Sequence, residues 1–169
     1  MAQRIEWKLW LTGVLMLIAL IGLGATVMGD SQFSITDHQS AGTAERVNEI
    51  QTAWQNEGYF GMHIFGMFAD LAFIIVYSLG AWRAGKGMNA QSSRFISTLG
   101  WVVMICALTF FVTDMTETSL QLVQMLMEQG IDWMAATAAF AQPIKSVTFI
   151  LSFFGVFVGL ISVRTARPL

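Results

Sequence analysis

Four long apolar runs constrain this chain more than any other feature of its sequence. They cover residues 9–28, 62–82, 96–113 and 143–163, and each approaches or exceeds the length that a helix needs to cross about 30 Å of hydrocarbon. Charged residues make up only 12% of the chain, about half the share found in soluble domains. We therefore predict an all-α integral membrane protein with a four-transmembrane-helix bundle. Residues 1–169 form a single domain, since too few residues lie outside the runs to bury a second core.

The basic residues beside the runs all fall on one side of the predicted bundle. They are Arg4, Lys8, Arg83, Lys86, Arg94, Arg164 and Arg167. Arg46 is the one cation in the connections on the other side. Because short cytoplasmic flanks are enriched in lysine and arginine, both the N- and the C-terminus are predicted to be cytoplasmic. Tryptophans near both predicted interfaces, such as Trp10 and Trp133, agree with this topology. The compact chain and its short loops favour a bacterial inner membrane.

The segments on the non-cytoplasmic side are predicted to be helical as well. Over residues 36–57 apolar side chains recur at three- and four-residue steps, which is typical of an amphipathic helix. This helix is expected to start near Thr36 or Asp37 and to end at Gly58. The third run continues its helical pattern without a breaker to about residue 129, so its helix is expected to project beyond the membrane.

The remaining connections are predicted from the residues that punctuate them. Asp132 is expected to cap the segment that returns to the membrane. Pro143 is either a kink in that segment or the first residue of the fourth helix proper. Residues 85–93, which are rich in Gly, Asn and Ser, predict a short turn between the second and third helices.

Polar side chains form one face on each of three predicted membrane helices. These candidate binding or relay residues are His63, Asp70 and Tyr77 on the second helix, Asp114 and Glu117 on the third, and Lys145 on the fourth. On the second helix they are seven residues apart, which is two helical turns, so they share a face. Since lipid tails offer no hydrogen bonds, the three faces are expected to meet inside the bundle.

Asp70 is the most informative of these residues because it lies near the middle of its run. An ionisable group at the bilayer centre costs about 3 kcal/mol, so it requires a partner, a proton or a task. A rise of about 1.5 Å per residue places Asp114 and Lys145 in one layer, with Asp70 about two turns deeper. Lys145 with Asp114 is therefore the predicted ion pair, although the long stem of Lys145 would also let it reach toward Asp70. The alternative interpretation is that all these groups are hydrogen-bonding glue between helices.

Gly155 and Gly159 form a GxxxG pattern within the fourth run, which lets two helix backbones approach closely. The pattern is either a dimer seam or the place where the fourth helix packs on the first helix. Because Ser152 lies on the same broad face, we prefer packing within the bundle.

No metal or cofactor site is predicted. His38 and His63 are the two histidines and lie on different segments, and Cys106 is the single cysteine. The chain contains no HExxH, GxSxG or glycine-rich phosphate motif, and no basic patch that would suit a nucleic acid. These observations favour a protein without enzymatic activity, although carboxylates near a histidine leave catalysis open.

The sequence predicts a non-catalytic integral membrane subunit. It is an accessory or assembly partner of a larger complex, or it binds a small amphiphile in a polar crevice in the outer half of the bundle. Membrane lipids, partner subunits or further copies of the chain are the expected partners. The alternative is a proton- or cation-coupled transporter or channel subunit that uses Asp70 and works as an oligomer. A third possibility is a membrane enzyme that uses the same cluster on a lipid-soluble substrate.

Overall fold

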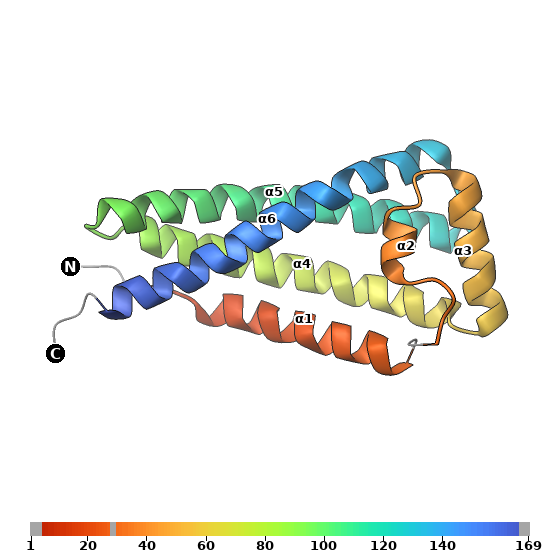
Figure 1. Ribbon diagram of the computed structural model, residues 1–169, viewed down its shortest axis with the longest axis horizontal. Coiled ribbons are helices and arrows are strands. Elements are labelled where there is room, and N and C mark those ends of the chain that lie inside the picture. The colour runs from red at the N-terminus through yellow and green to blue at the C-terminus, as the bar shows by residue number, and fades with distance from the viewer. Residues whose placement is uncertain (1–4, 28–29, 166–169) are drawn as a thin grey trace.

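The computed structural model describes residues 5–27 and 30–165, and these residues form helices and no strand (Figure 1). The four long helices are α1 (Lys8–Val27), α4 (Phe60–Asn89), α5 (Arg94–Leu126) and α6 (Asp132–Thr165). Each is long and apolar enough to span a membrane, which confirms the predicted all-helical class and the predicted number of such helices. Two shorter helices, α2 (Ile35–Gln39) and α3 (Ala44–Glu57), connect α1 to α4. Met28, Arg4 and Arg167, which entered the predicted span and topology, lie outside the described residues.

The long helices extend past the predicted limits of the spans. Residues 85–89 belong to α4 and not to a turn, because Gly85 packs against α5: a Cβ on Gly85 would lie 2.9 Å from the carbonyl oxygen of Gly100. The α5 helix ends at Leu126, three residues before the predicted limit. Pro143 lies inside α6, which begins at Asp132 and packs on α5. Of the two predicted roles of Pro143, the first residue of a helix is therefore wrong.

The predicted amphipathic helix over residues 36–57 is wrong in its continuity, because two helices occupy this segment. Ser34, and not Thr36 or Asp37, is the N-cap of α2; its hydroxyl accepts from the backbone N–H of Asp37, whose carboxylate accepts from the N–H of Ser34 at 2.7 Å. Gly42 then takes a left-handed conformation with φ +71°, which breaks the helical path before α3. The predicted end at Gly58 is confirmed.

Asp132 was expected to cap its own helix, but its carboxylate lies at the start of a different one. Its Oδ1 accepts a hydrogen bond from the backbone N–H of Ala44 at 2.8 Å, and the side chain of Asn48 accepts one from the N–H of Gly130 at 2.6 Å. These two bonds join α3 to the connection between α5 and α6. They hold α3 in place although α3 is 14 residues long and mostly polar outside its buried face.

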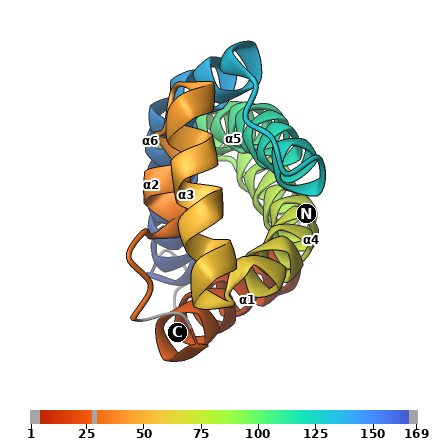
Figure 2. The ribbon, with the colours of Figure 1, turned by 90° about the vertical axis from the view of Figure 1, so that its right-hand side faces the viewer.

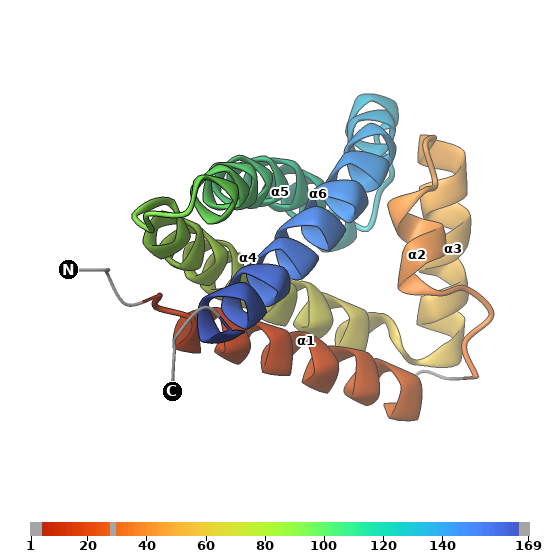
Figure 3. The same ribbon diagram turned by 60° about the vertical axis from the view of Figure 1, so that its left-hand side comes forward.

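The long helices come together at one end of the bundle, and α1 and α6 separate toward the other end. Consecutive long helices pack side by side, α4 on α5 and α5 on α6, whereas α1 packs mainly along α4. Near the α4–α5 turn α1 also meets α6, where the rings of Trp10 and Phe153 are 5.5 Å apart. Toward the opposite end α1 and α6 diverge (Figure 3). The α3 helix lies across this opposite end, which we call the α3 end (Figure 2).

Two buried cores hold these helices together. The larger lies between the four long helices and centres on Phe73, Tyr77, Phe110 and the partly buried Phe149. The packing of α1 against α4 beside this core requires a glycine at Gly80, because a Cβ there would collide with the backbone of Trp10. The smaller core lies beneath α3 and contains Ile50, Trp54, Met67, Leu122 and Met125.

Large apolar side chains cover the outer surface of the long helices. Among the most exposed are Ile18, Phe65, Phe95, Phe140 and Phe154. Water would make such a continuous apolar surface prone to association, whereas lipid is a matching solvent for it. The exposed surface therefore agrees with the hydropathy of the helices.

Candidate functional site

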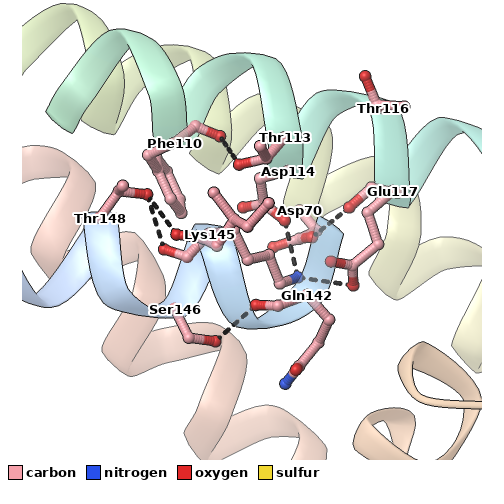
Figure 4. A network of polar contacts seen from close by, with 12 residues as sticks. Asp70, Phe110, Thr113, Asp114, Thr116, Glu117, Gln142, Lys145, Ser146 and Thr148 are labelled. Carbon is pink, nitrogen blue, oxygen red and sulfur yellow. Dashed lines mark hydrogen bonds and ion pairs between the residues drawn. The ribbon is translucent and has the colours of Figure 1, made fainter. Parts of the chain in front are cut away.

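A buried ion cluster lies where α5 faces α6 toward the α3 end of the bundle (Figure 4). The ammonium of Lys145 is 2.8 Å from Asp114 Oδ1 and 2.8 Å from Glu117 Oε1. Asp114 is 3% exposed and Glu117 is fully buried. The two acids are three residues apart on α5, so they share the face of α5 that lies against α6. The predicted pair of Lys145 with Asp114 is present, and Glu117 completes it as a second partner of the same ammonium.

Asp70 joins this cluster from α4 through a neutral group, so the prediction that it lies about two turns deeper than Asp114 and Lys145 is wrong. The hydroxyl of Thr118, which is buried on α5, donates to Asp70 Oδ2 at 3.1 Å. Among the described contacts the ion pairs of Lys145 go to Asp114 and Glu117 and not to Asp70. One ammonium thus stands beside three carboxylates, and full ionisation would leave an excess of negative charge. Such an excess in a poorly solvated site requires protons or a further cation.

Two cavities meet at Asp70 in the region where α1 and α6 diverge. The first, of about 500 Å³, lies between α1, α4 and the segment that leads into α2. The second, of about 370 Å³, lies against α5 and α6 and is lined by Asp114 and Lys145. Asp70, Leu17 and Gln39 line both. Asp70 is therefore placed between the ion cluster and an apolar cavity.

His63 lies away from the ion cluster, although sequence reasoning grouped it with Lys145 and Asp114. Its imidazole stacks on the indole of Trp54, with ring centroids 3.6 Å apart and planes 18° apart. It nevertheless lines the first cavity together with Asp70, which lies two turns further along the same face of α4. The side chain is 4% exposed, and its Nε2 has no hydrogen-bond partner in the described part of the chain.

His38 is a neighbour of this site that sequence reasoning did not assign. It packs on Trp54 at a centroid distance of 5.1 Å and is 2% exposed, with both ring nitrogens lacking a partner among residues 5–27 and 30–165. Burial, and to a lesser extent the nearby His63, lowers the pKa of His38 to about 4, so the ring is neutral at pH 7. The available signal was that Trp54 and His38 belong to the amphipathic stretch next to the second run.

The segment between α1 and α2 is tied to α3 above the first cavity. The indole N–H of Trp54 donates to the carbonyl oxygen of Phe33 at 2.8 Å. The carboxylate of Glu57 accepts from the Ser31 hydroxyl at 2.6 Å and from the Gln32 backbone N–H at 3.0 Å, and these bonds lower the pKa of Glu57. The wall that this segment contributes to the cavity is therefore fixed by α3.

Tyr77 belongs to the larger core and not to the ion cluster. Its hydroxyl is 2.9 Å from the Ser152 hydroxyl, and aromatic rings of Phe73, Phe110 and Phe149 surround it. The spacing that put His63, Asp70 and Tyr77 on one face also separates neighbouring members by about 10 Å along the helix axis. Three residues on one face of α4 are therefore distributed over three different environments.

Gly155 and Gly159 face helices of the same chain. A Cβ on Gly155 would collide with the Val103 side chain of α5, and one on Gly159 would collide with the Met88 side chain of α4. Packing within the bundle is therefore present at both glycines, but the prediction that they contact the first helix is wrong, because their neighbours lie on α5 and α4. Ser152 lies on this face, and its hydroxyl is 2.9 Å from that of Tyr77.

The described residues contain no group of three His, Cys, Asp or Glu side chains that would hold a metal ion. No protein-family model, curated protein or solved structure was found to match the chain. The fold and the site therefore define the class: an all-helical protein with four helices long and apolar enough to span a membrane, and with a buried ion cluster beside a cavity.

Proposed function

We propose that the protein is an integral membrane protein that binds a small amphiphile in the first cavity, which we call the crevice. The observation that carries the proposal is the division of its lining. On the α1 side Leu17, Leu20, Ile21, Gly24 and Ala25 form an apolar wall. On the side of α2 and α4 the polar lining groups are Ser31, Ser34, Gln39, His63 and Asp70.

This division suits a molecule with an apolar chain and one polar end. A volume of about 500 Å³ is in the usual range for small-molecule sites, which are mostly apolar with a few polar groups that orient the ligand. The chain would lie along α1, and the polar end would lie between His63 and Asp70. The divergence of α1 from α6 supports entry from the lipid side.

Substitution of Gly66 by Leu is expected to empty the crevice. Gly66 lines it, and a Cβ there meets no other atom within 4 Å, so the new side chain would occupy ligand space without distorting the helix. The amount of bound amphiphile, measured by mass spectrometry of extracts from the purified protein, should fall about tenfold or more. Gly61→Leu is the matched control, because Gly61 also has open space around its Cβ but does not line the crevice. Equal amounts from both variants would contradict the proposal.

We further propose that the α3 end faces the non-cytoplasmic side of a bacterial inner membrane. Within the described residues, Lys8, Arg83, Lys86, Arg94 and Arg164 support this orientation, because they lie near the opposite ends of the long helices. A fluorescent protein fused to the C-terminus should fluoresce, and alkaline phosphatase inserted at Gly130 should be active. The reverse pattern of activities would show the opposite orientation.

A second candidate function is proton- or cation-coupled transport by an oligomer of this chain. The observation that favours it is the place of Asp70 between two cavities, with one ammonium among three carboxylates. Asp70→Asn is then expected to abolish a proton-linked flux in proteoliposomes while the protein stays folded. An unchanged flux in this variant would remove the main support for transport.

Both proposals allow the chain to act as a subunit of a larger membrane complex. The α1 helix supports this, since it packs mainly along α4 and leaves Leu15 and Ile18 exposed outside the crevice. This surface fits lipid or a membrane helix of a partner.

A further inference from the structure

We propose that the ligand of the crevice carries a protonated amine and that Asp70 is its counter-ion. The inference rests on the proposed function and adds the chemical class of the ligand: an alkyl amine with its ammonium at Asp70 and its chain along α1.

The one ammonium of the ion cluster is already engaged. Lys145 lies 2.8 Å from Asp114 and 2.8 Å from Glu117, so its positive charge is shared by two buried carboxylates. Asp70 receives a neutral hydroxyl donor from Thr118 on its Oδ2 atom. A carboxylate in a poorly solvated site needs more than one neutral hydrogen bond to remain charged. Asp70 therefore has room for a cationic partner.

The crevice offers Asp70 to a ligand without a competing charge. Among the described residues that line the crevice, Asp70 is the only charged one. An anionic head group there would meet Asp70 directly and Asp114 nearby, with the ammonium of Lys145 already held by two acids. Like charges at such short range are unfavourable, and an anionic amphiphile is the class that the crevice disfavours most.

The neutral polar groups of the crevice suit the hydrogen atoms of an ammonium. An ammonium has three N–H donors and no acceptor. Besides the Asp70 carboxylate, the lining provides hydroxyl oxygens of Ser31 and Ser34 and the amide of Gln39. The Nε2 of His63, buried and without a partner in the described structure, is a further acceptor in the tautomer that leaves it unprotonated. A crevice whose charged lining group is a carboxylate and whose other polar lining groups are neutral acceptors suits a cation that donates hydrogen bonds.

The apolar wall determines the rest of the ligand. Leu17, Leu20 and Ile21 follow one another along α1 at helical spacing and face the crevice. A flexible alkyl chain would bury its methylene groups against them, at about 0.8 kcal/mol for each group removed from water. An inorganic cation would leave this wall without a function.

The test compares three probes with the same chain: dodecylamine, dodecanol and dodecanoate. Radiolabelled probe is bound to the full-length protein in nanodiscs, and binding to empty nanodiscs is subtracted. Dodecylamine should bind about tenfold more tightly than dodecanol, the size expected for a charge-assisted hydrogen bond, and dodecanoate should bind most weakly. Asp70→Asn should remove the preference for the amine and leave dodecanol binding intact, which also shows that the crevice is still folded.

Glu128→Gln is the matched control, because Glu128 is an exposed acid at the α3 end that does not line the crevice. It should leave all three affinities unchanged. If the three probes bind equally and Gly66→Leu weakens all of them, the amine inference is overturned while the proposed function stands. If no probe binds, or if Gly66→Leu leaves amine binding unchanged, the inference is overturned together with the proposed site. If Asp70→Asn abolishes binding of both the amine and the alcohol, the variant has lost the crevice as a whole. The relative affinities of the three probes for the unmodified protein then decide whether the amine inference stands.

Discussion

Replacing Lys145 with Met is expected to destabilise the protein by about 3–5 kcal/mol, the usual cost of removing one partner from a buried ion pair. The ammonium is the common partner of Asp114 and Glu117, and both acids are almost completely buried. Without it two carboxylates would face each other in a poorly solvated interior. The measurement is the free energy of unfolding in mixed micelles, where the variant should unfold at a lower fraction of denaturing detergent.

Lys86→Met is the control for this experiment. Lys86 is exposed on α4 and carries the same charge, so its replacement should change the free energy of unfolding by less than about 0.5 kcal/mol. Adding Asp114→Asn and Glu117→Gln to Lys145→Met should recover most of the loss, because the two acids that pair with the ammonium then carry no charge. A cost below about 1 kcal/mol for Lys145→Met alone would show that the cluster contributes little to stability.

Replacing Trp54 with Ala should cost a further large amount, about 3–5 kcal/mol, as is typical of a buried tryptophan. Trp54 is fully buried in the core beneath α3, stacks on His63 and donates to the Phe33 carbonyl. Its loss removes the main apolar anchor of α3 and releases the segment that lines the crevice. Hydrogen exchange should therefore rise across Ala44–Glu57, and amphiphile binding should weaken with it.

Two variants separate the parts of this effect. Trp54→Phe keeps an aromatic ring against His63 but loses the bond to Phe33, so it should cost much less than Trp54→Ala. Trp133→Ala removes an exposed tryptophan on α6 and should leave the exchange of α3 unchanged. Equal exchange of α3 in Trp54→Ala and in the unmodified protein would mean that the other bonds of α3 suffice to hold it.

The parts of the fold that the sequence predicted are those that depend on one helix at a time. The four spans follow from the length of each apolar run, and the end of α3 follows from Gly58. The distance of each residue along its own helix also predicts the pair of Lys145 with Asp114, but the same measure wrongly separates Asp70 from this pair by about two turns. Helix boundaries were less predictable. The sequence around Gly85 predicts a turn, whereas Gly85 belongs to α4 and packs against α5.

The parts of the candidate site that sequence reasoning missed depend on how helices rotate and diverge. Residue spacing could not show that Thr118 would bond to Asp70, or that His38 and His63 would pack on one indole. Both results require separate helices to present particular faces to each other.

By itself, the sequence determined the number of apolar helices and their polar faces, because these follow from hydrophobicity and from the period of a single helix. Only the tertiary structure decided that α1 diverges from α6 and leaves a crevice at Asp70. The physical reason is that small side chains such as Gly80 let α1 approach α4 closely, whereas α1 and α6 meet near Trp10 and separate beyond it. This arrangement depends on how the surfaces of α1, α4 and α6 fit together, and the sequence of one helix alone does not contain that information.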